Sequence, residues 1–155
     1  MADERYTPQI DVAIMMKLFG QAVRMLPQMI EDPKERLLAA NLVVEEALEF
    51  ADALGFNAEE QENGSIKLVP SGREPDLVKA IDGLGDILVV TYGGFNRLGV
   101  LAEPVFREVN RSNMSKVWPD GTIHKRESDG KVIKPDSYSP ADIKGVIESL
   151  LPVSK

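Results

Sequence analysis

Apolar residues recur at helical spacing through most of the chain, and this pattern predicts four helices followed by a tail of different character. The first expected helix covers residues 8–30. Thr7 is its expected N-cap, Pro8 stands in its first turn, and a break is expected near Pro27. Thr7 and Pro8 therefore define the start of this helix, whereas Pro27 lies before its expected end.

The remaining helices have sharper signals. The second is expected over residues 33–54, with Asp32 as its N-cap and Glu35 completing a capping box. The third is expected over residues 76–98 and the fourth over residues 102–116. Together they predict an all-α fold with a four-helix bundle core.

Turn-rich segments separate these helices from smaller elements. Residues 57–75 are rich in Gly, Pro and polar side chains, and predict a loop with one short strand. Two alternating runs around Asp129 and Gly130 predict a small C-terminal β-hairpin, and a short terminal helix is expected after its cap, Ser139. A single domain is expected over residues 1–155, with its core at about 8–117 and the hairpin and tail at 118–155.

Composition narrows the class of protein. The chain has 155 residues, 43% of them hydrophobic and 28% charged, which is typical of a globular fold. Its net charge of −7 disfavours nucleic acid polymers, and no apolar run is long enough for a membrane span. The absence of cysteine and of an N-terminal signal pattern favours a cytoplasmic location.

Two acidic stripes interrupt the apolar helices. The second helix contains "VVEEALEF" (residues 43–50), and the third has acids at i+3 and i+7 from Lys79. Crowded carboxylates in an apolar groove repel one another, and an all-oxygen site suits Mg²⁺ or Mn²⁺. The alternative is a solvated helix face, with Lys79 as a charge partner of Asp82. The candidate metal ligands are Glu45, Glu46, Glu49, Asp82 and Asp86.

These motifs resemble those of a known family. "EEALE" (residues 45–49) followed by "DGLGDILVVTYG" (residues 82–93) is similar to the acidic motifs of the all-α nucleoside triphosphate pyrophosphohydrolases. "EVNRSNMSKVWPDG" (residues 108–121) resembles a segment of their MazG-like, phosphoribosyl-ATP-pyrophosphohydrolase-like members, which are often encoded by phages. The resemblance covers most of residues 10–140.

The resemblance implies roles for the acidic residues. Glu46, Glu49 and Asp86 are expected to bind two or three Mg²⁺ or Mn²⁺ ions, with Glu45 as a further ligand or a support for one. Gly83 stands where the family has a glutamate, so Asp82 is expected to supply the missing carboxylate. Either Glu49 or Glu45 is expected to act as the general base.

Further residues are expected to contact the substrate. Asn110, Ser112, Asn113 and Lys116 would contact phosphates or sugar, although capping of a helix C-terminus also explains them. Lys79 is an alternative phosphate ligand. The resemblance adds Phe19 and Gln21 at a nucleobase pocket, whereas His124 and Trp118 are interpreted as a surface residue and a packing residue.

The expected reaction is hydrolysis of a nucleoside triphosphate to the monophosphate and pyrophosphate. Resemblance to phage-type members favours a purine deoxynucleotide such as dGTP, in control of the nucleotide pool, with dUTP or dCTP as alternatives. A non-catalytic nucleotide-binding regulator is a further alternative, supported by Gly83. Because the second and third helices are apolar around most of their circumference, a homodimer or homotetramer is expected.

Overall fold

The computed structural model describes residues 7–152, and the chain divides into two units, Met1–Gly99 and Val100–Lys155. The described part contains five helices and one two-stranded antiparallel sheet. The prediction of a mostly helical fold is therefore confirmed. The four-helix bundle and the single domain over residues 1–155 stay predictions, since the fourth helix belongs to the second unit.

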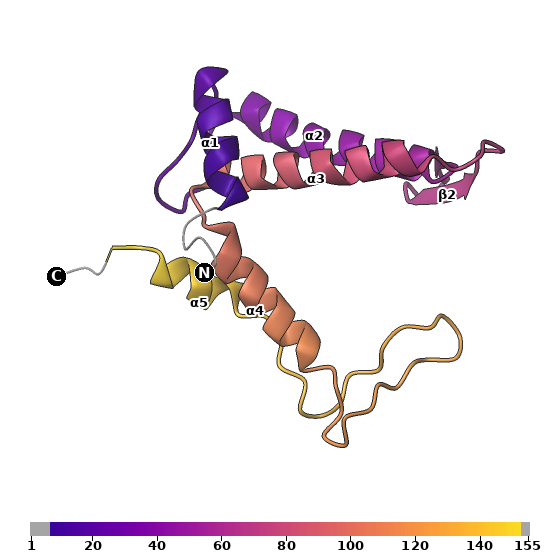
Figure 1. The fold of residues 1–155 in the computed structure, drawn as a ribbon. Coiled ribbons are helices and arrows are strands. Elements are labelled where there is room, and N and C mark those ends of the chain that lie inside the picture. The colour runs from indigo at the N-terminus through magenta and orange to yellow at the C-terminus, as the bar shows by residue number, and fades with distance from the viewer. Residues whose placement is uncertain (1–6, 153–155) are drawn as a thin grey trace, which may run out of the picture. The chain divides into compact units, whose positions relative to one another are not determined.

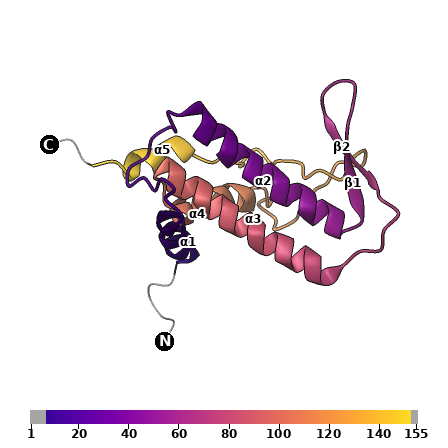
Figure 2. The same ribbon diagram turned by 90° about the horizontal axis from the view of Figure 1, so that it is seen from above.

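Two long helices form the frame of the first unit. They are α2 (Pro33–Ala53) and α3 (Leu77–Leu98), which pack side by side in Figures 1 and 2. Gly83 of α3 is buried at this contact, where an added Cβ would stand 3.4 Å from the Cα of Phe50 in α2. Gly83 therefore faces the backbone of α2 directly, and a Cβ there would make an ordinary van der Waals contact.

Local signals define where these helices begin and end. The Oδ1 atom of Asp32 accepts a hydrogen bond from the backbone N–H of Lys34 at 2.9 Å, which confirms the predicted cap of α2. Asp76 caps α3 in the same way. Gly99 ends α3 with φ +68°, and a Cβ there would stand 2.1 Å from the carbonyl oxygen of Leu26, so only glycine fits.

The first helix is shorter than predicted. α1 spans Pro8–Leu18 and stops before Gly20, whose φ is +69°. The N–H of Gln21 donates to the carbonyl of Met16 at 2.8 Å, which closes the last turn. The expectation of a helix over residues 8–30 was wrong because a left-handed glycine ends it well before Pro27. Thr7 stands at the N-cap, but its side chain makes no capping bond.

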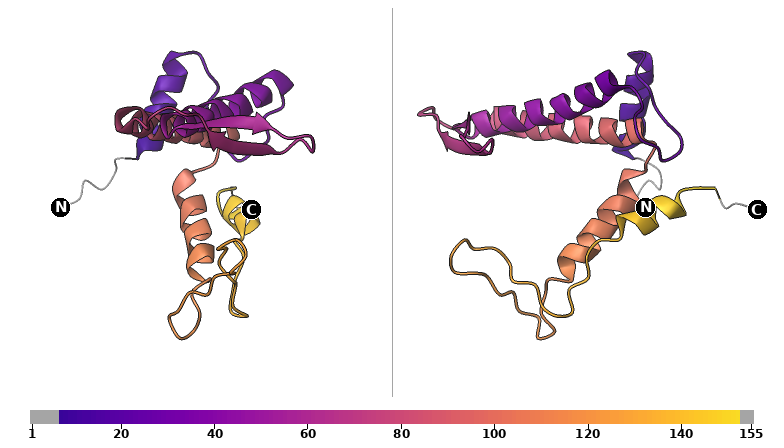
Figure 3. Two further views of the ribbon diagram at one scale, coloured as in Figure 1. Left: turned by 90° about the vertical axis from the view of Figure 1, so that its right-hand side faces the viewer. Right: turned by 180° about the vertical axis from the view of Figure 1, so that it is seen from behind.

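The sheet lies where the sequence predicted a loop with one strand. β1 (Phe56–Glu60) and β2 (Ile66–Pro70) pair antiparallel, with Phe56 opposite Pro70 and Glu60 opposite Ile66. Figure 1 shows the hairpin at the end of the α2/α3 pair remote from α1, and Figure 3 shows it from the side. Gly64, with φ +76°, allows the tight connection.

The second unit contains α4 (Ala102–Met114) and α5 (Ile143–Ser149), which pack against each other. The hairpin predicted around Asp129 and Gly130 is present only as a turn with one isolated antiparallel bridge, Lys125 to Val132. Its exposed side chains provide no apolar face to support longer strands.

The terminal helix also starts later than expected. Asp142, not Ser139, caps α5 by accepting a hydrogen bond from the N–H of Gly145 at 2.9 Å. The N–H of Ser139 donates instead to the hydroxyl of Ser115. None of the described helices combines the length and apolar character that a bilayer crossing requires.

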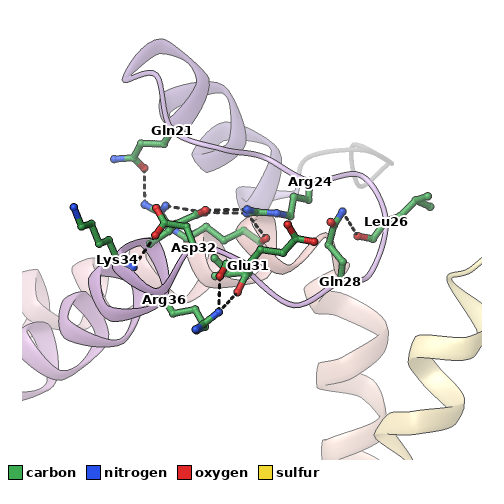
Figure 4. A network of polar contacts seen from close by, with 11 residues as sticks. Gln21, Arg24, Leu26, Gln28, Glu31, Asp32, Lys34 and Arg36 are labelled. Atoms are coloured by element: carbon green, nitrogen blue, oxygen red, sulfur yellow. Dashed lines mark hydrogen bonds and ion pairs between the residues drawn. The ribbon is translucent and has the colours of Figure 1, made fainter.

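An ionic network ties the segment after α1 to α2 and α3 (Figure 4). Two nitrogens of Arg24 donate to the two carboxylate oxygens of Glu35, each at 2.8 Å. Arg97 of α3, which is only 4% exposed, approaches the same carboxylate at 3.5 Å. The predicted capping box was therefore wrong, because Glu35 turns away from the helix start toward two arginines.

The apolar core of the first unit is small. In the single chain most of the large apolar side chains of α2 and α3 are exposed. The buried apolar residues of this unit are small or come from α1 and the segment after it: Val12, Met16, Ile30, Ala51, Ala53 and Ala80.

Replacing Glu35 by glutamine should destabilise the first unit, because the buried guanidinium of Arg97 loses its carboxylate partner. We expect the free energy of unfolding to fall by about 3 kcal/mol at pH 7. The hydrogen bond from Arg24 and then the charges of Arg24 and Arg97 lower the pKa of Glu35. The ionised carboxylate of Glu35 therefore stabilises the folded unit. Its full contribution is present above the ordinary glutamate pKa of about 4.3, and it is lost as pH falls through the lowered pKa of Glu35 in the folded protein. Urea denaturation at pH 7 and pH 3 measures both effects.

Glu31→Gln is the matched control. Glu31 is an exposed neighbour whose charge also acts on Arg24, but its side chain forms no ion pair within residues 7–152. Its replacement should change stability by less than about 0.5 kcal/mol. Equal losses in the two variants would contradict the structural role of Glu35.

Candidate active site

A groove between α2 and α3 gathers most of the predicted acidic residues. It has a volume of about 410 Å³ and is open to solvent. Helical spacing on each helix turns its polar residues toward the neighbouring helix. The groove is lined by Leu48, Glu49, Asp52, Ala53, Lys79, Asp82, Gly83 and Asp86.

Glu45 and Glu46 do not line this groove, but they share its electrostatic field. Burial raises the pKa of Glu46, and the nearby negative charges raise it further. In decreasing order of effect, these charges belong to Asp86, Glu49, Glu45 and Asp82. The structure therefore brings all five predicted carboxylates into one cluster, with Glu46 half-buried and the others exposed.

Among the described residues, no basic side chain forms an ion pair with this cluster. Within residues 7–152, none of the five carboxylates forms a hydrogen bond or ion pair, and Lys79 forms no ion pair with Asp82. Oxygen donors of this kind suit Mg²⁺ or Mn²⁺, so the donor chemistry fits a divalent ion. In the part of the chain described, however, no three acidic or histidine side chains already converge on one metal position.

The sequence analysis did not assign a role to the pair Asp52 and Arg73. Asp52 lies one turn beyond Glu49, and its carboxylate accepts a hydrogen bond from Arg73. Arg73 also donates to the side-chain oxygen of Asn57 at 3.0 Å. Helical spacing from Glu49 places Asp52 on the same face of α2, but Arg73 comes from the loop before α3, where no periodicity signals a contact.

A second, smaller pocket lies between α1, α2 and α3. Its volume is about 180 Å³, and both Phe19 and Gln21 line it, while their contact with a nucleobase stays a prediction. The side-chain oxygen of Gln21 accepts a hydrogen bond from Arg97 at 3.0 Å. The other walls are mainly apolar: Val12, Met15, Met16, Ala39, Leu42, Val89, Val90, Gly93 and Gly94.

The predicted phosphate contacts lie on α4 and just after it, in the second unit. Asn110 and Asn113 are exposed, and the side-chain oxygen of Asn113 accepts a hydrogen bond from Lys116 at 2.7 Å. Ser112 is buried, and its hydroxyl donates to the hydroxyl of Tyr138 at 3.4 Å. Substrate contact by these four residues stays a prediction.

The aromatic residues of the second unit pack against each other. His124 is exposed, and its ring lies 4.4 Å from that of Trp118. The indole N–H of Trp118 donates to the carbonyl of Ile133 at 3.3 Å. These contacts connect residues within the segment after α4. His124 was expected at the surface and Trp118 as a packing residue.

The first unit defines a helical protein with a carboxylate-lined groove between two neighbouring helices. The model of the phosphoribosyl-ATP pyrophosphohydrolase family matches residues 12–113, and the chain belongs to this family, which is part of the MazG-like nucleotide pyrophosphohydrolase superfamily. Membership supports a nucleotide pyrophosphohydrolase activity in general. No curated protein matches the chain. The match includes both acidic stripes and stops before residues 114–155.

Glu46→Gln should stabilise the metal-free protein, because it removes the most strongly repelled charge of the cluster. We expect a rise in melting temperature of about 3 °C in chelator, the scale of 1 kcal/mol for a chain of this length. Mg²⁺ should then raise the melting temperature of this variant less than that of the wild type. Thermal melts with chelator and with Mg²⁺ measure both shifts.

Glu60→Gln on the exposed strand β1 is the control and removes the same charge outside the cluster. It should leave both melting temperatures close to those of the wild type. A destabilised Glu46→Gln protein in chelator would mean that Glu46 has a favourable partner.

Proposed function

We propose that this chain is a metal-dependent nucleoside triphosphate pyrophosphohydrolase, which converts a (deoxy)nucleoside triphosphate to the monophosphate and pyrophosphate. The observation that supports this most directly is the cluster of five unpaired carboxylates between α2 and α3, inside the region that matches the family. A triphosphate and this cluster repel each other unless divalent cations lie between them.

The cluster has the residues that the reaction needs. Glu46, Glu49, Asp82 and Asp86, with Glu45 beside them, would bind Mg²⁺ or Mn²⁺. When bound, such ions neutralise phosphate charge and make water a stronger nucleophile. Water breaks the anhydride between the α- and β-phosphates, and the carboxylate of Glu49 or Glu45 accepts the proton that the water loses. Lys79, at the edge of the groove, balances part of the phosphate charge.

The second pocket suits the base of the nucleotide. Met15, Met16 and Phe19 offer polarisable and aromatic walls for a flat ring. Because the oxygen of Gln21 is occupied by Arg97, its amide N–H groups are left as donors. A donor at this position favours bases that carry a carbonyl acceptor, which all the common bases except adenine do.

We propose dGTP as the preferred substrate, since guanine is the common purine base with a carbonyl acceptor, and dUTP and dCTP are the alternatives. The family description names phosphoribosyl-ATP, which therefore belongs in the same comparison. A nucleotide-binding regulator without turnover is the non-enzymatic alternative. It is supported by Gly83, which removes one carboxylate from the position where the family has a glutamate.

We also propose that the protein works as a homodimer or homotetramer. Leu77, Ile81, Leu84 and Leu88 of α3 follow one another at helical spacing and form an apolar stripe. Their side chains are 43% to 76% exposed in the single chain. A stripe of this length in water is typical of an interface, and a second copy supplies a matching surface through two-fold symmetry.

Glu49→Gln should lower turnover by about a hundredfold or more, the scale for a positioned base or ligand. Pyrophosphate release is measured with Mn²⁺ for each common NTP and dNTP and for phosphoribosyl-ATP. The wild type should release pyrophosphate and monophosphate, most rapidly from dGTP, and chelator should abolish the reaction. Glu60→Gln is the matched control and should retain wild-type rates.

Three results would contradict the proposal. Undiminished hydrolysis in chelator would exclude the metal requirement. Orthophosphate and a diphosphate as first products would assign a different reaction. Tight nucleotide binding without turnover of any substrate would favour the regulator.

Ile81→Lys should dissociate the oligomer, because a charged side chain enters the centre of the apolar stripe. Sedimentation equilibrium at micromolar concentration should show the wild type as a dimer or tetramer and this variant as a 17.1 kDa monomer. Ile66→Lys, on β2, is the control: Ile66 is 63% exposed, against 61% for Ile81. A monomeric, fully active wild type would refute the oligomer.

A further inference from the structure

The tail beyond the family match folds back onto α4. The N–H of Asp142 donates to the carboxylate of Glu108 at 2.7 Å, and Arg111 donates to the carbonyl of Pro140 at 2.9 Å. The hydroxyl of Ser115 contacts both the carbonyl and the N–H of Ser139. These bonds hold the tail against the face of α4 that carries Glu108, Arg111 and Ser115, with the buried Ser112 beside them.

Tyr138 lies at the centre of this contact. The buried hydroxyl of Ser112 donates to the Tyr138 hydroxyl at 3.4 Å, so the Tyr138 O–H remains available to donate outward. The ammonium group of Lys134 lies 4.2 Å from the centroid of the Tyr138 ring. The hydrogen bond from Ser112 is the main cause that lowers the Tyr138 pKa, and Lys134 and Lys116 lower it further. Both lysines therefore act on the same hydroxyl.

These two lysines lack carboxylate partners, unlike most cations of the second unit. Arg107, Arg111, Arg126, Lys131 and Lys144 each form an ion pair. Among the described residues of this unit, only Lys116, Lys125 and Lys134 form none. Lys116 is held instead by the side-chain oxygen of Asn113. Lys134 thus lies against Tyr138, and Lys116 stands four residues after Ser112, the hydrogen-bond partner of Tyr138.

We propose that Tyr138, Lys134 and Lys116 form an oxyanion site within the second unit, which binds phosphate groups of a nucleotide. Two ammonium groups and one hydroxyl donor offer the positive charge and the directed hydrogen bond that phosphate oxygens accept. The assignment of the ligand as a nucleotide rests on the function proposed above, whereas the oxyanion site rests on the contacts within the second unit. Tyr138 and Lys134 lie outside the family match, which ends at residue 113.

Binding of inorganic pyrophosphate to the full chain, measured by isothermal titration calorimetry in chelator, tests the site without metal or turnover. We expect the wild type to bind at millimolar concentration or below, and Lys134→Gln and Tyr138→Phe each to weaken binding by about tenfold, the scale of one charge-assisted hydrogen bond. Thermal melts identify any variant that has lost its fold. Because Lys134 is an exposed side chain, Lys134→Gln remains informative if Tyr138→Phe does not fold.

Lys125→Gln is the matched control, since it removes the same charge from another exposed, unpaired lysine of the unit. It should change pyrophosphate binding by less than about twofold. No binding by the wild type, or an equal loss in Lys125→Gln and Lys134→Gln, would overturn the proposal.

Steady-state kinetics with the nucleotide substrate then tests whether the oxyanion site binds that substrate. Lys134→Gln should raise KM more than it lowers kcat, because it removes binding and leaves the carboxylate cluster unchanged. If no nucleotide is hydrolysed but pyrophosphate binding depends on Lys134 and Tyr138, the proposed function fails and the oxyanion site stands. If turnover is normal and KM is unchanged in both variants, the tail has no role in substrate binding.

Discussion

The close packing of α2 against α3 is the contact on which the first unit depends, and it also creates the electrostatic problem of the site. Gly83 of α3 faces Phe50 of α2, and the same packing brings the acids of both helices together. Glu46 shows the consequence, since burial and four neighbouring carboxylates raise its pKa. A glutamate at position 83 would add a further negative charge to this helix contact. Gly83 therefore keeps the repulsion between the two helices lower than a glutamate would.

Small buried residues make this packing possible but leave the first unit with little core. Alanines and glycines fill the helix contact, while the large apolar residues of α3 remain exposed. The network of Glu35 with Arg24 and Arg97 adds connections that the apolar core does not supply. A chain built in this way is expected to gain much of its stability from a second copy and from bound cations, because both remove features that destabilise it alone.

The parts of the fold that follow from local signals could be predicted from the sequence. Asp32 and Gly99 act at their own helix ends, and helical spacing alone places Glu49, Asp82 and Asp86 on facing stripes. The errors concern residues whose conformation depends on distant partners or on competing local signals. Glu35 has the spacing of a capping box, but Arg24 and Arg97 bind it more strongly. Gly20 ends α1, although the sequence favoured a break at Pro27. The turn at Gly64 allows two strands to pair where one strand was expected.

The carboxylate cluster and the region around Tyr138 have opposite electrostatic requirements. The cluster has uncompensated negative charge, whereas Lys116 and Lys134 are cations without carboxylate partners among the described residues. The proposed function needs positive charge, because a nucleoside triphosphate is a polyanion and the net charge of the chain, −7, repels it. Bound divalent ions or lysines without carboxylate partners are the two local sources of positive charge that such an acidic chain can offer to phosphate groups.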